Sequence, residues 1–180
     1  MPASPPPVRV GFLGAGFIST FHSNMLRMCD EPHERAGVFD PDSGRAEAFV
    51  VEHGGHVAAS VDEVIASSDA VYVCTWTSEH PELVARVCDA GTAVFVEKPL
   101  GVDLAAAREV AATLDRSGVI HQVGLVLRYS PAFTLLESLL GETDRNGRVM
   151  AVVFRDDQYL PTGGQYRSTW RADVDKAGAG

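Results

Sequence analysis

This chain of 180 residues lacks three features that would place it in a special class of protein. No apolar run approaches the roughly 20 residues needed to cross a bilayer, and the proline-rich leader at residues 1–7 has no apolar core of signal-peptide length. Lysine and arginine form no cluster, and a net charge of -9 disfavours binding to nucleic-acid phosphates. We therefore expect no membrane or nucleic-acid partner, and the cytoplasm is the simplest location.

Cysteine is also scarce. Cys29, Cys74 and Cys88 are odd in number and lie in segments that are predicted as helix or strand interiors, so we expect buried thiols rather than disulfides. His53 and His56 flank a flexible Gly-Gly turn without a cysteine or carboxylate cluster, so no metal site is predicted.

A glycine-rich turn near the start of the chain is the most informative feature that is present. The β-prone run 8–13 leads into this turn, and a helix-compatible segment follows it. Gly14 and Gly16 fill the first two places of the G-x-G-x-x-G pattern, and Ser19 stands at the third. Such a turn lets backbone amides and a helix N-terminus approach a diphosphate. The predicted cofactor contacts in this turn are Gly14, Ala15, Gly16, Phe17 and Ile18.

An acidic residue follows at the spacing that the dinucleotide fingerprint requires. The apolar run 36–39 ends in Asp40, which is placed to accept hydrogen bonds from an adenosine ribose. A carboxylate there repels a 2′-phosphate, so NAD is favoured over NADP. The alternative is that Asp40 is only a turn residue before Pro41.

Strands and helices alternate along most of the chain, which predicts an α/β fold with a doubly wound parallel sheet of the Rossmann type. We expect strands at 8–13, 35–40, near 57, 69–75, 92–96 and 119–127, and helices at 20–28, 43–52, from Ser60 onward, 79–90 and 103–117. Ser60 and Glu63 have the spacing of a capping box, and Asp103 is a favourable N-cap. A linker helix at 131–140 and a strand of a different sheet at 147–155 come next. From Asp156 onward, the apolar periodicity that predicts strands and helices is absent, and we expect the residues after it to be mobile unless a neighbouring chain pairs with them.

Several motifs together resemble the family of glucose-fructose oxidoreductase, inositol dehydrogenase and rhizopine catabolism protein (Gfo/Idh/MocA). They are the glycine turn, the Glu97-Lys98-Pro99 motif, Gln122-Val123-Gly124 and Arg128-Tyr129-Ser130-Pro131. The resemblance implies an NAD(P)-dependent dehydrogenase that transfers a hydride between nicotinamide and a sugar, cyclitol or related polyol. It also implies that Lys98 is catalytic and that Glu97 and Lys98 adjoin the cofactor. The alternative is a surface lysine paired with its neighbour Glu97.

Other positions follow from the same resemblance. Thr75, Trp76 and His80 lie where the family carries a Thr-Pro turn followed by a histidine, with Trp76 in place of the proline. Trp76 either packs near the cofactor or only covers the sheet edge, and His80 is expected to orient the turn. His22 is expected to pack near the glycine turn. The candidate substrate residues are Arg128, Tyr166, Trp170 and Arg171.

The resemblance also predicts the domain organisation. Residues 8–130 correspond to the cofactor domain, and 131–180 to a linker helix and the start of a truncated α+β substrate and dimerisation domain. The family's Asp or His partners in proton transfer have no counterpart before Gly180, so we expect cofactor binding with little turnover, and homo-oligomerisation. Two other functions are considered. One is a non-catalytic dinucleotide sensor or interaction module, and the other is a methyltransferase, in which Glu97-Lys98-Pro99 would have no place.

Overall fold

A six-stranded parallel sheet forms the centre of the molecule. The computed structural model describes residues 5–155 and 170–178. The strand order is β3-β2-β1-β4-β5-β6, and every neighbouring pair is parallel. The strands are β1 Val8–Leu13, β2 His33–Phe39, β3 His56–Val57, β4 Ala70–Val73, β5 Ala93–Val96 and β6 His121–Val123. The predicted doubly wound parallel sheet is confirmed.

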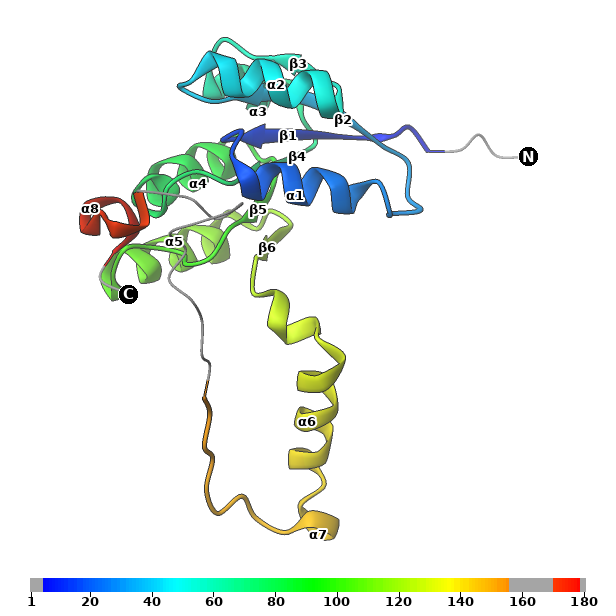
Figure 1. Ribbon diagram of the computed structural model, residues 1–180, viewed down its shortest axis with the longest axis vertical. Helices are drawn as coiled ribbons and strands as arrows, with labels where there is room; N and C mark the ends of the chain where they lie inside the picture. The colour runs from blue at the N-terminus through cyan, green and yellow to red at the C-terminus, as the bar shows by residue number, and fades with distance from the viewer. Residues whose placement is uncertain (1–4, 156–169, 179–180) are drawn as a thin grey trace.

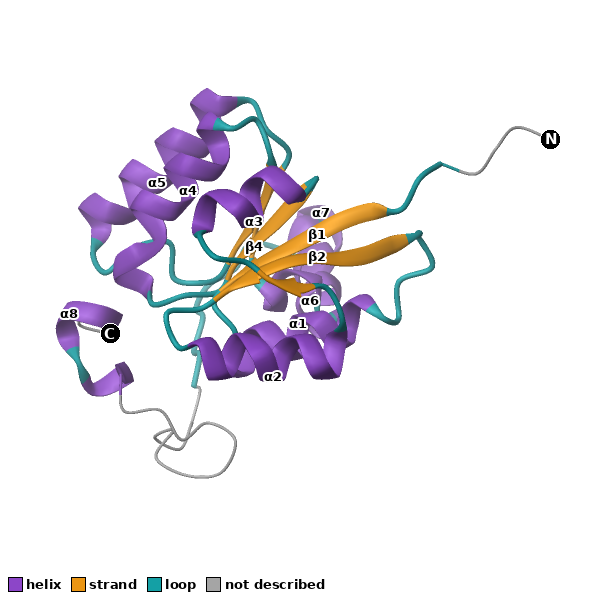
Figure 2. Ribbon diagram, turned by 90° about the horizontal axis from the view of Figure 1, so that it is seen from above, coloured by secondary structure: helices purple, strands orange, loops and turns teal. Residues whose placement is uncertain are grey.

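Helices cover both faces of this sheet. They are α1 Phe17–Leu26, α2 Ser43–His53, α3 Val61–Ser67, α4 His80–Asp89 and α5 Leu104–Ser117. Figure 2 shows α1 and α2 on one face and α3, α4 and α5 on the other. Each helix connects two parallel strands, and a parallel connection needs such a crossover.

Side-chain alternation along β1 divides the apolar core between the two faces. Val10 and Phe12 belong to a buried cluster with residues of β2 and α2, whereas Leu13 packs into the larger cluster beneath α3, α4 and α5. Gly11 faces α3, where an added Cβ would overlap Ser68 Oγ and approach Val64 Cγ1 to 2.7 Å. Glycine at this position therefore lets α3 pack closely on the central strand.

Side chains cap several helices as the sequence predicts. Ser60 Oγ accepts a hydrogen bond from the Glu63 amide at 3.2 Å, and Glu63 Oε2 accepts one from the Ala59 amide at 2.7 Å. Ser60 thus makes the N-cap half of the predicted capping box, whereas Glu63 reaches the amide of Ala59, one residue before the N-cap, rather than that of Ser60. Asp103 caps α5 by accepting from the Ala106 amide at 2.8 Å. These local contacts fix where the two helices begin.

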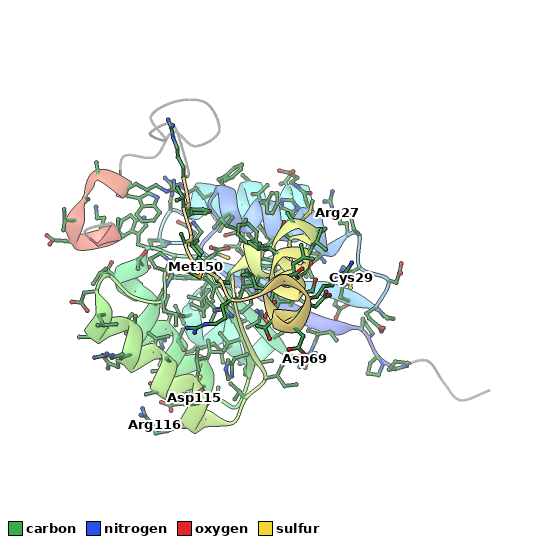
Figure 3. All side chains as sticks on the ribbon, turned by 90° about the horizontal axis from the view of Figure 1, so that it is seen from below. Arg27, Cys29, Asp69, Asp115, Arg116 and Met150 are labelled. Atoms are coloured by element: carbon green, nitrogen blue, oxygen red, sulfur yellow. The ribbon has the colours of Figure 1, made fainter. Side chains whose placement is uncertain are left out.

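The structure corrects three predictions. Helix α1 ends at Leu26, so Cys29 lies beyond it and is exposed rather than buried (Figure 3). The predicted strand 119–127 is shorter, because after Val123 the chain turns and the short helix η2 Val126–Tyr129 follows. Residues 147–155 form no strand in the structure, and their side chains are exposed. An isolated extended segment has no partner for its backbone hydrogen bonds, so its β-prone composition alone does not make it a strand.

Beyond the sheet, the chain first leaves the body of the molecule and then returns to it. Helices α6 Pro131–Gly141 and α7 Thr143–Asn146 extend away from the sheet, and η4 Trp170–Ala172 and α8 Val174–Ala177 lie beside α4 and α5 (Figure 1). Helix α8 contacts η1 Thr77–Glu79, and an added Cβ at Gly178 would overlap the Val102 carbonyl. The expected loss of order after Asp156 does not hold for 170–178, because this segment packs on the sheet domain.

Candidate cofactor and catalytic site

The predicted site residues gather at the carboxyl ends of the parallel strands. The glycine turn follows β1, Asp40 follows β2, Thr75 follows β4, and Glu97 and Lys98 follow β5. Strand order reverses at β1, which lies between β2 and β4. In open α/β sheets, ligands bind at such a reversal, outside the carboxyl ends of the strands.

Glycine occurs at the two positions of the turn for different structural reasons. Gly14 has a φ of 90°, and an added Cβ would lie 2.8 Å from the Cys74 carbonyl oxygen, so a side chain is excluded by both conformation and contact. Gly16 is the N-cap of α1 and has no atom within 4 Å of the position of an added Cβ. The turn is thus packed on β4 at Gly14 and open at Gly16, where a ligand can approach the helix N-terminus.

Ser19 closes the turn from within α1. It is completely buried, and its hydroxyl donates to the Gly14 carbonyl at 2.6 Å. The third position of the motif needs a small residue, because the helix packs closely on the sheet there. The structure adds a hydrogen bond that holds the first turn of α1 against the glycine loop.

Asp40 contacts the glycine turn directly. Its Oδ2 accepts a hydrogen bond from the Ala15 amide at 2.8 Å, and its Oδ1 accepts one from the Asp42 amide at 2.9 Å. The Ala15 amide, expected to face a phosphate, therefore already has a protein partner. Each carboxylate oxygen can accept more than one hydrogen bond, so capacity for ribose hydroxyls remains.

The motif after β5 separates a buried carboxylate from an exposed ammonium. Glu97 is 7% exposed, whereas Lys98 is exposed. Glu97 Oε1 lies 2.6 Å from His22 Nε2, and Oε2 accepts a hydrogen bond from the Lys98 backbone amide at 3.0 Å. The Glu97 side chain is therefore directed into the protein, toward α1. This arrangement disagrees with a surface ion pair between Glu97 and the Lys98 side chain.

A second buried histidine supports the same motif from α4. His80 is 1% exposed, and its Nδ1 donates to the Pro99 carbonyl at 2.9 Å. Because a carbonyl only accepts, the Nδ1 atom carries the proton. Burial lowers the pKa of His80, so the ring is neutral near pH 7. His80 was expected to orient the turn that contains Thr75 and Trp76, and this stays a prediction, because the hydrogen bond described here reaches Pro99 in the motif after β5.

Two residues near the end of β4 differ in their surroundings. Trp76 is partly exposed, and Lys176 Nζ of α8 lies 4.4 Å from the centre of its ring, a cation–π contact. No local sequence pattern predicts this contact, because 100 positions separate the two residues. Cys74 is fully buried, and burial raises the pKa of its thiol well above the ordinary range. A neutral thiol is a poor nucleophile, so Cys74 is a packing residue.

The candidate substrate residues lie outside the sheet. Arg128 is exposed in η2, and Trp170 and Arg171 lie in η4 with the Arg171 Cζ 5.0 Å from the Trp170 ring centre. Tyr166 lies outside the described residues. In the part of the chain that the structure describes, no group of three or more metal-ligating side chains comes together, and no helix is long and apolar enough to cross a membrane.

Comparison with known proteins gives the family. Residues 8–125 match the family described as "Oxidoreductase family, NAD-binding Rossmann fold". The chain belongs to this Gfo/Idh/MocA family. The matched residues include the glycine turn, Asp40, Thr75 and the Glu97-Lys98-Pro99 motif. The resemblance inferred from the sequence is confirmed.

Individual relatives agree with this assignment. Inositol 2-dehydrogenase of Cereibacter sphaeroides is 35% identical over 133 residues, which are 72% of this chain and 40% of that protein. The scyllo-inositol 2-dehydrogenase (NAD(+)) of Bacillus subtilis is 33% identical over 70% of this chain and 38% of its own length. The crystal structure of GenD2 from gentamicin A biosynthesis in complex with NAD superposes with a TM-score of 0.70 at 27% identity, covering 79% of this chain and 41% of that one. The chain thus spans about 40% of the length of these Gfo/Idh/MocA proteins.

Proposed function

We propose that this chain provides the cofactor-binding half of an NAD-dependent oxidoreductase that acts on a hydroxyl group of a sugar, cyclitol or related polyol. The observation that carries the proposal is the position of Asp40 beside the glycine turn, where one carboxylate oxygen contacts the Ala15 amide. Diphosphate and ribose sites are thereby adjacent at the reversal of strand order.

The residues at this edge fit a dinucleotide. The N-terminus of α1 is sterically open at Gly16 and suits the diphosphate, because backbone amides at a helix N-terminus and the helix dipole favour an anion. Asp40 suits the adenosine ribose and disfavours a 2′-phosphate, which supports NAD over NADP. Phe17 and Ile18 lie in the first turn of α1 and are only partly covered, so they flank the same edge.

Lys98 is the residue to which we assign proton chemistry. Bound nicotinamide supplies the hydride acceptor or donor. The exposed Lys98 ammonium lies at the end of β5, where it orients a substrate hydroxyl and stabilises the negative charge that develops on its oxygen during oxidation. Glu97 faces away from solvent, which leaves Lys98 as the charged group that this turn presents to a ligand.

The polyol class of substrate is supported by the relatives, several of which carry the name inositol 2-dehydrogenase. Arg128, Trp170 and Arg171 supply hydrogen-bonding groups outside the sheet and are the described residues that we assign to the substrate side. Large apolar side chains of α6, including Leu135 and Leu139, are exposed. Exposed apolar side chains of this kind support binding to another protein surface, and we propose that this surface belongs to a second copy of the chain. Free cysteines support a reducing, cytoplasmic location.

Titration of the purified chain with NADH, NADPH and S-adenosylmethionine tests the proposal. Trp76 lies at the site, so quenching of tryptophan emission and energy transfer to the reduced nicotinamide report binding. We expect saturable binding of NADH, weaker binding of NADPH and none of S-adenosylmethionine. No measurable affinity of the folded chain for either nicotinamide cofactor would refute the assignment. A non-catalytic sensor, the second candidate, would bind NADH equally well when Lys98 is replaced by methionine, and a longer protein containing this half would oxidise no polyol. Polyol oxidation that is lost in K98M while NADH binding is kept would instead support the enzyme.

A further inference from the structure

A buried hydrogen-bonded pair joins α1 to the catalytic motif. His22 Nε2 and Glu97 Oε1 lie 2.6 Å apart, and the two side chains are 10% and 9% exposed. His22 comes from the second turn of α1, and Glu97 follows β5, so the pair spans 75 positions of sequence. Burying a carboxylate away from water is unfavourable unless the group is paired and hydrogen-bonded. The contact with His22 therefore stabilises the buried Glu97 side chain.

The Glu97 carboxylate is fixed on every side that the structure describes. Its second oxygen accepts the Lys98 amide at 3.0 Å. Gly124, after β6, faces the carboxylate so closely that an added Cβ would lie 3.0 Å from Oε1. The His22 ring is itself held by aromatic contacts, 4.8 Å between centroids to Phe95 and 5.5 Å to Tyr72. Both partners are thus in contact with further residues that favour the observed pairing.

The same helix face reaches the diphosphate site. Ser19, one turn before His22, donates to the Gly14 carbonyl at 2.6 Å, and Ser19, His22 and Ser23 form the buried side of α1. Helix α1 therefore contacts the glycine turn at its first turn and, at its second turn, the Glu97 carboxylate that accepts the Lys98 backbone amide. The relative position of the two sites depends on these buried polar contacts rather than on the loops alone.

We propose that His22 is a positioning residue for Lys98: by holding the Glu97 carboxylate, it fixes the Lys98 backbone and so the place of the ammonium group relative to a dinucleotide at the glycine turn. The inference rests on the proposed function only for the identity of the ligand. The alternative is that the pair stabilises the fold without affecting Lys98.

The lysine content of the chain allows a direct test. Lys98 and Lys176 are its two lysines, so in a K176R background Lys98 is the single lysine side chain. Reductive methylation with carbon-13 formaldehyde then labels Lys98 and the amino terminus, and these two resonances separate because the amines titrate in different pH ranges. The position and width of the Lys98 resonance report its surroundings, and thermal unfolding measured in parallel reports stability.

Three variants are compared in this background. H22L removes the hydrogen bond, H22Q retains a side-chain amide that can donate to Glu97, and H53L replaces another histidine with a buried side chain, at the end of α2. We expect H22L to shift and sharpen the Lys98 resonance toward that of a freely rotating lysine. H22Q restores the original resonance at least in part, and H53L leaves it in place even if the midpoint of unfolding falls.

An unchanged Lys98 resonance in folded H22L would overturn the proposal, as would an equal change in H53L. If H22L fails to fold, E97Q takes its place, because it keeps the size of the side chain while removing the charge that His22 holds. An unchanged resonance in E97Q would then count against the proposal. These spectra are recorded without cofactor. Failure of NADH to bind the K176R reference would therefore refute the proposed function and leave the positioning result to be judged separately.

Discussion

The Asp40 carboxylate accepts a hydrogen bond from the Ala15 amide at 2.8 Å, which ties the end of β2 to the turn after β1. Its other oxygen accepts the Asp42 amide at 2.9 Å. The carboxylate is therefore fixed before any ligand arrives. A group held in its binding geometry loses little conformational freedom on binding, so the proposed function gives Asp40 a role in ligand recognition in addition to its structural one.

Replacing Asp40 by alanine tests this double role. Because a hydrogen bond to a charged group contributes about 1.5–3 kcal/mol, we expect D40A to bind NADH about tenfold or more weakly. The repulsion of a 2′-phosphate is also removed, so the preference for NADH over NADPH should narrow. Fluorescence titration with both cofactors measures the effect. D42A is the control, since Asp42 caps α2 through the Gly44 amide. It should lower stability by ~1 kcal/mol and retain the NADH preference.

The two glycines of the turn should respond differently to alanine. G14A places a Cβ 2.8 Å from the Cys74 carbonyl at a φ of 90°, so we expect a loss of roughly 1–3 kcal/mol in the free energy of unfolding. G16A meets no protein atom within 4 Å and should unfold near the midpoint of the wild type. It should nevertheless weaken NADH binding, because the added methyl group lies where a diphosphate approaches. Equal stability losses in the two variants would contradict this account.

The three cysteines should react with thiol reagents at different rates. Cys29 is exposed, whereas Cys74 and Cys88 are buried and burial also raises the pKa of Cys74. In the native chain we expect one rapidly reacting thiol, which disappears in C29S, and reaction of the other two only after denaturation. A colorimetric disulfide reagent, used with and without denaturant, gives the count. Rapid labelling of native C29S would show that Cys74 or Cys88 is accessible.

Stability should fall in mild acid because of His80. Burial lowers the pKa of His80 below its ordinary value of 6.5, so the unfolded chain binds a proton more readily than the folded chain. The contribution of the neutral ring is complete above about pH 6.5 and is lost as the pH falls from there toward the folded pKa. Denaturant unfolding at a series of pH values between about 7.5 and 5 measures the slope of the free energy of unfolding against pH. This interval brackets the ordinary pKa of histidine.

The control for this pH dependence is H80Q, which removes the titrating ring. We expect a shallower slope below about pH 6.5 in H80Q than in the wild type. His53 also has a pKa lowered by burial, so H80Q should not abolish the dependence completely. An identical slope in both proteins would show that His80 is not the titrating group.

The sequence alone determined the sheet domain and indicated the residues that we assign to the cofactor. The glycine turn, Asp40 and the buried apolar runs of β4 and β5 are local signals, because a tight turn and a parallel strand covered on both faces need particular residue types at particular positions. Capping residues such as Ser60 and Asp103 are equally local, and the structure confirms them. For the same reason, prediction was poor where no local rule applies, as at the end of α1 near Cys29 and in the segment 147–155.

Only the tertiary structure decided which side chains meet. The pairing of His22 with Glu97, the support of Pro99 by His80 and the contact of Lys176 with Trp76 join residues separated by 75, 19 and 100 positions. No spacing rule connects such residues, because their distance is set by helix packing on the sheet rather than by the period of one element. The sequence therefore predicted Lys98 at the proposed site, and the packing of α1 and α4 brought His22 to Glu97 and His80 to Pro99, the two neighbours of Lys98 in the chain.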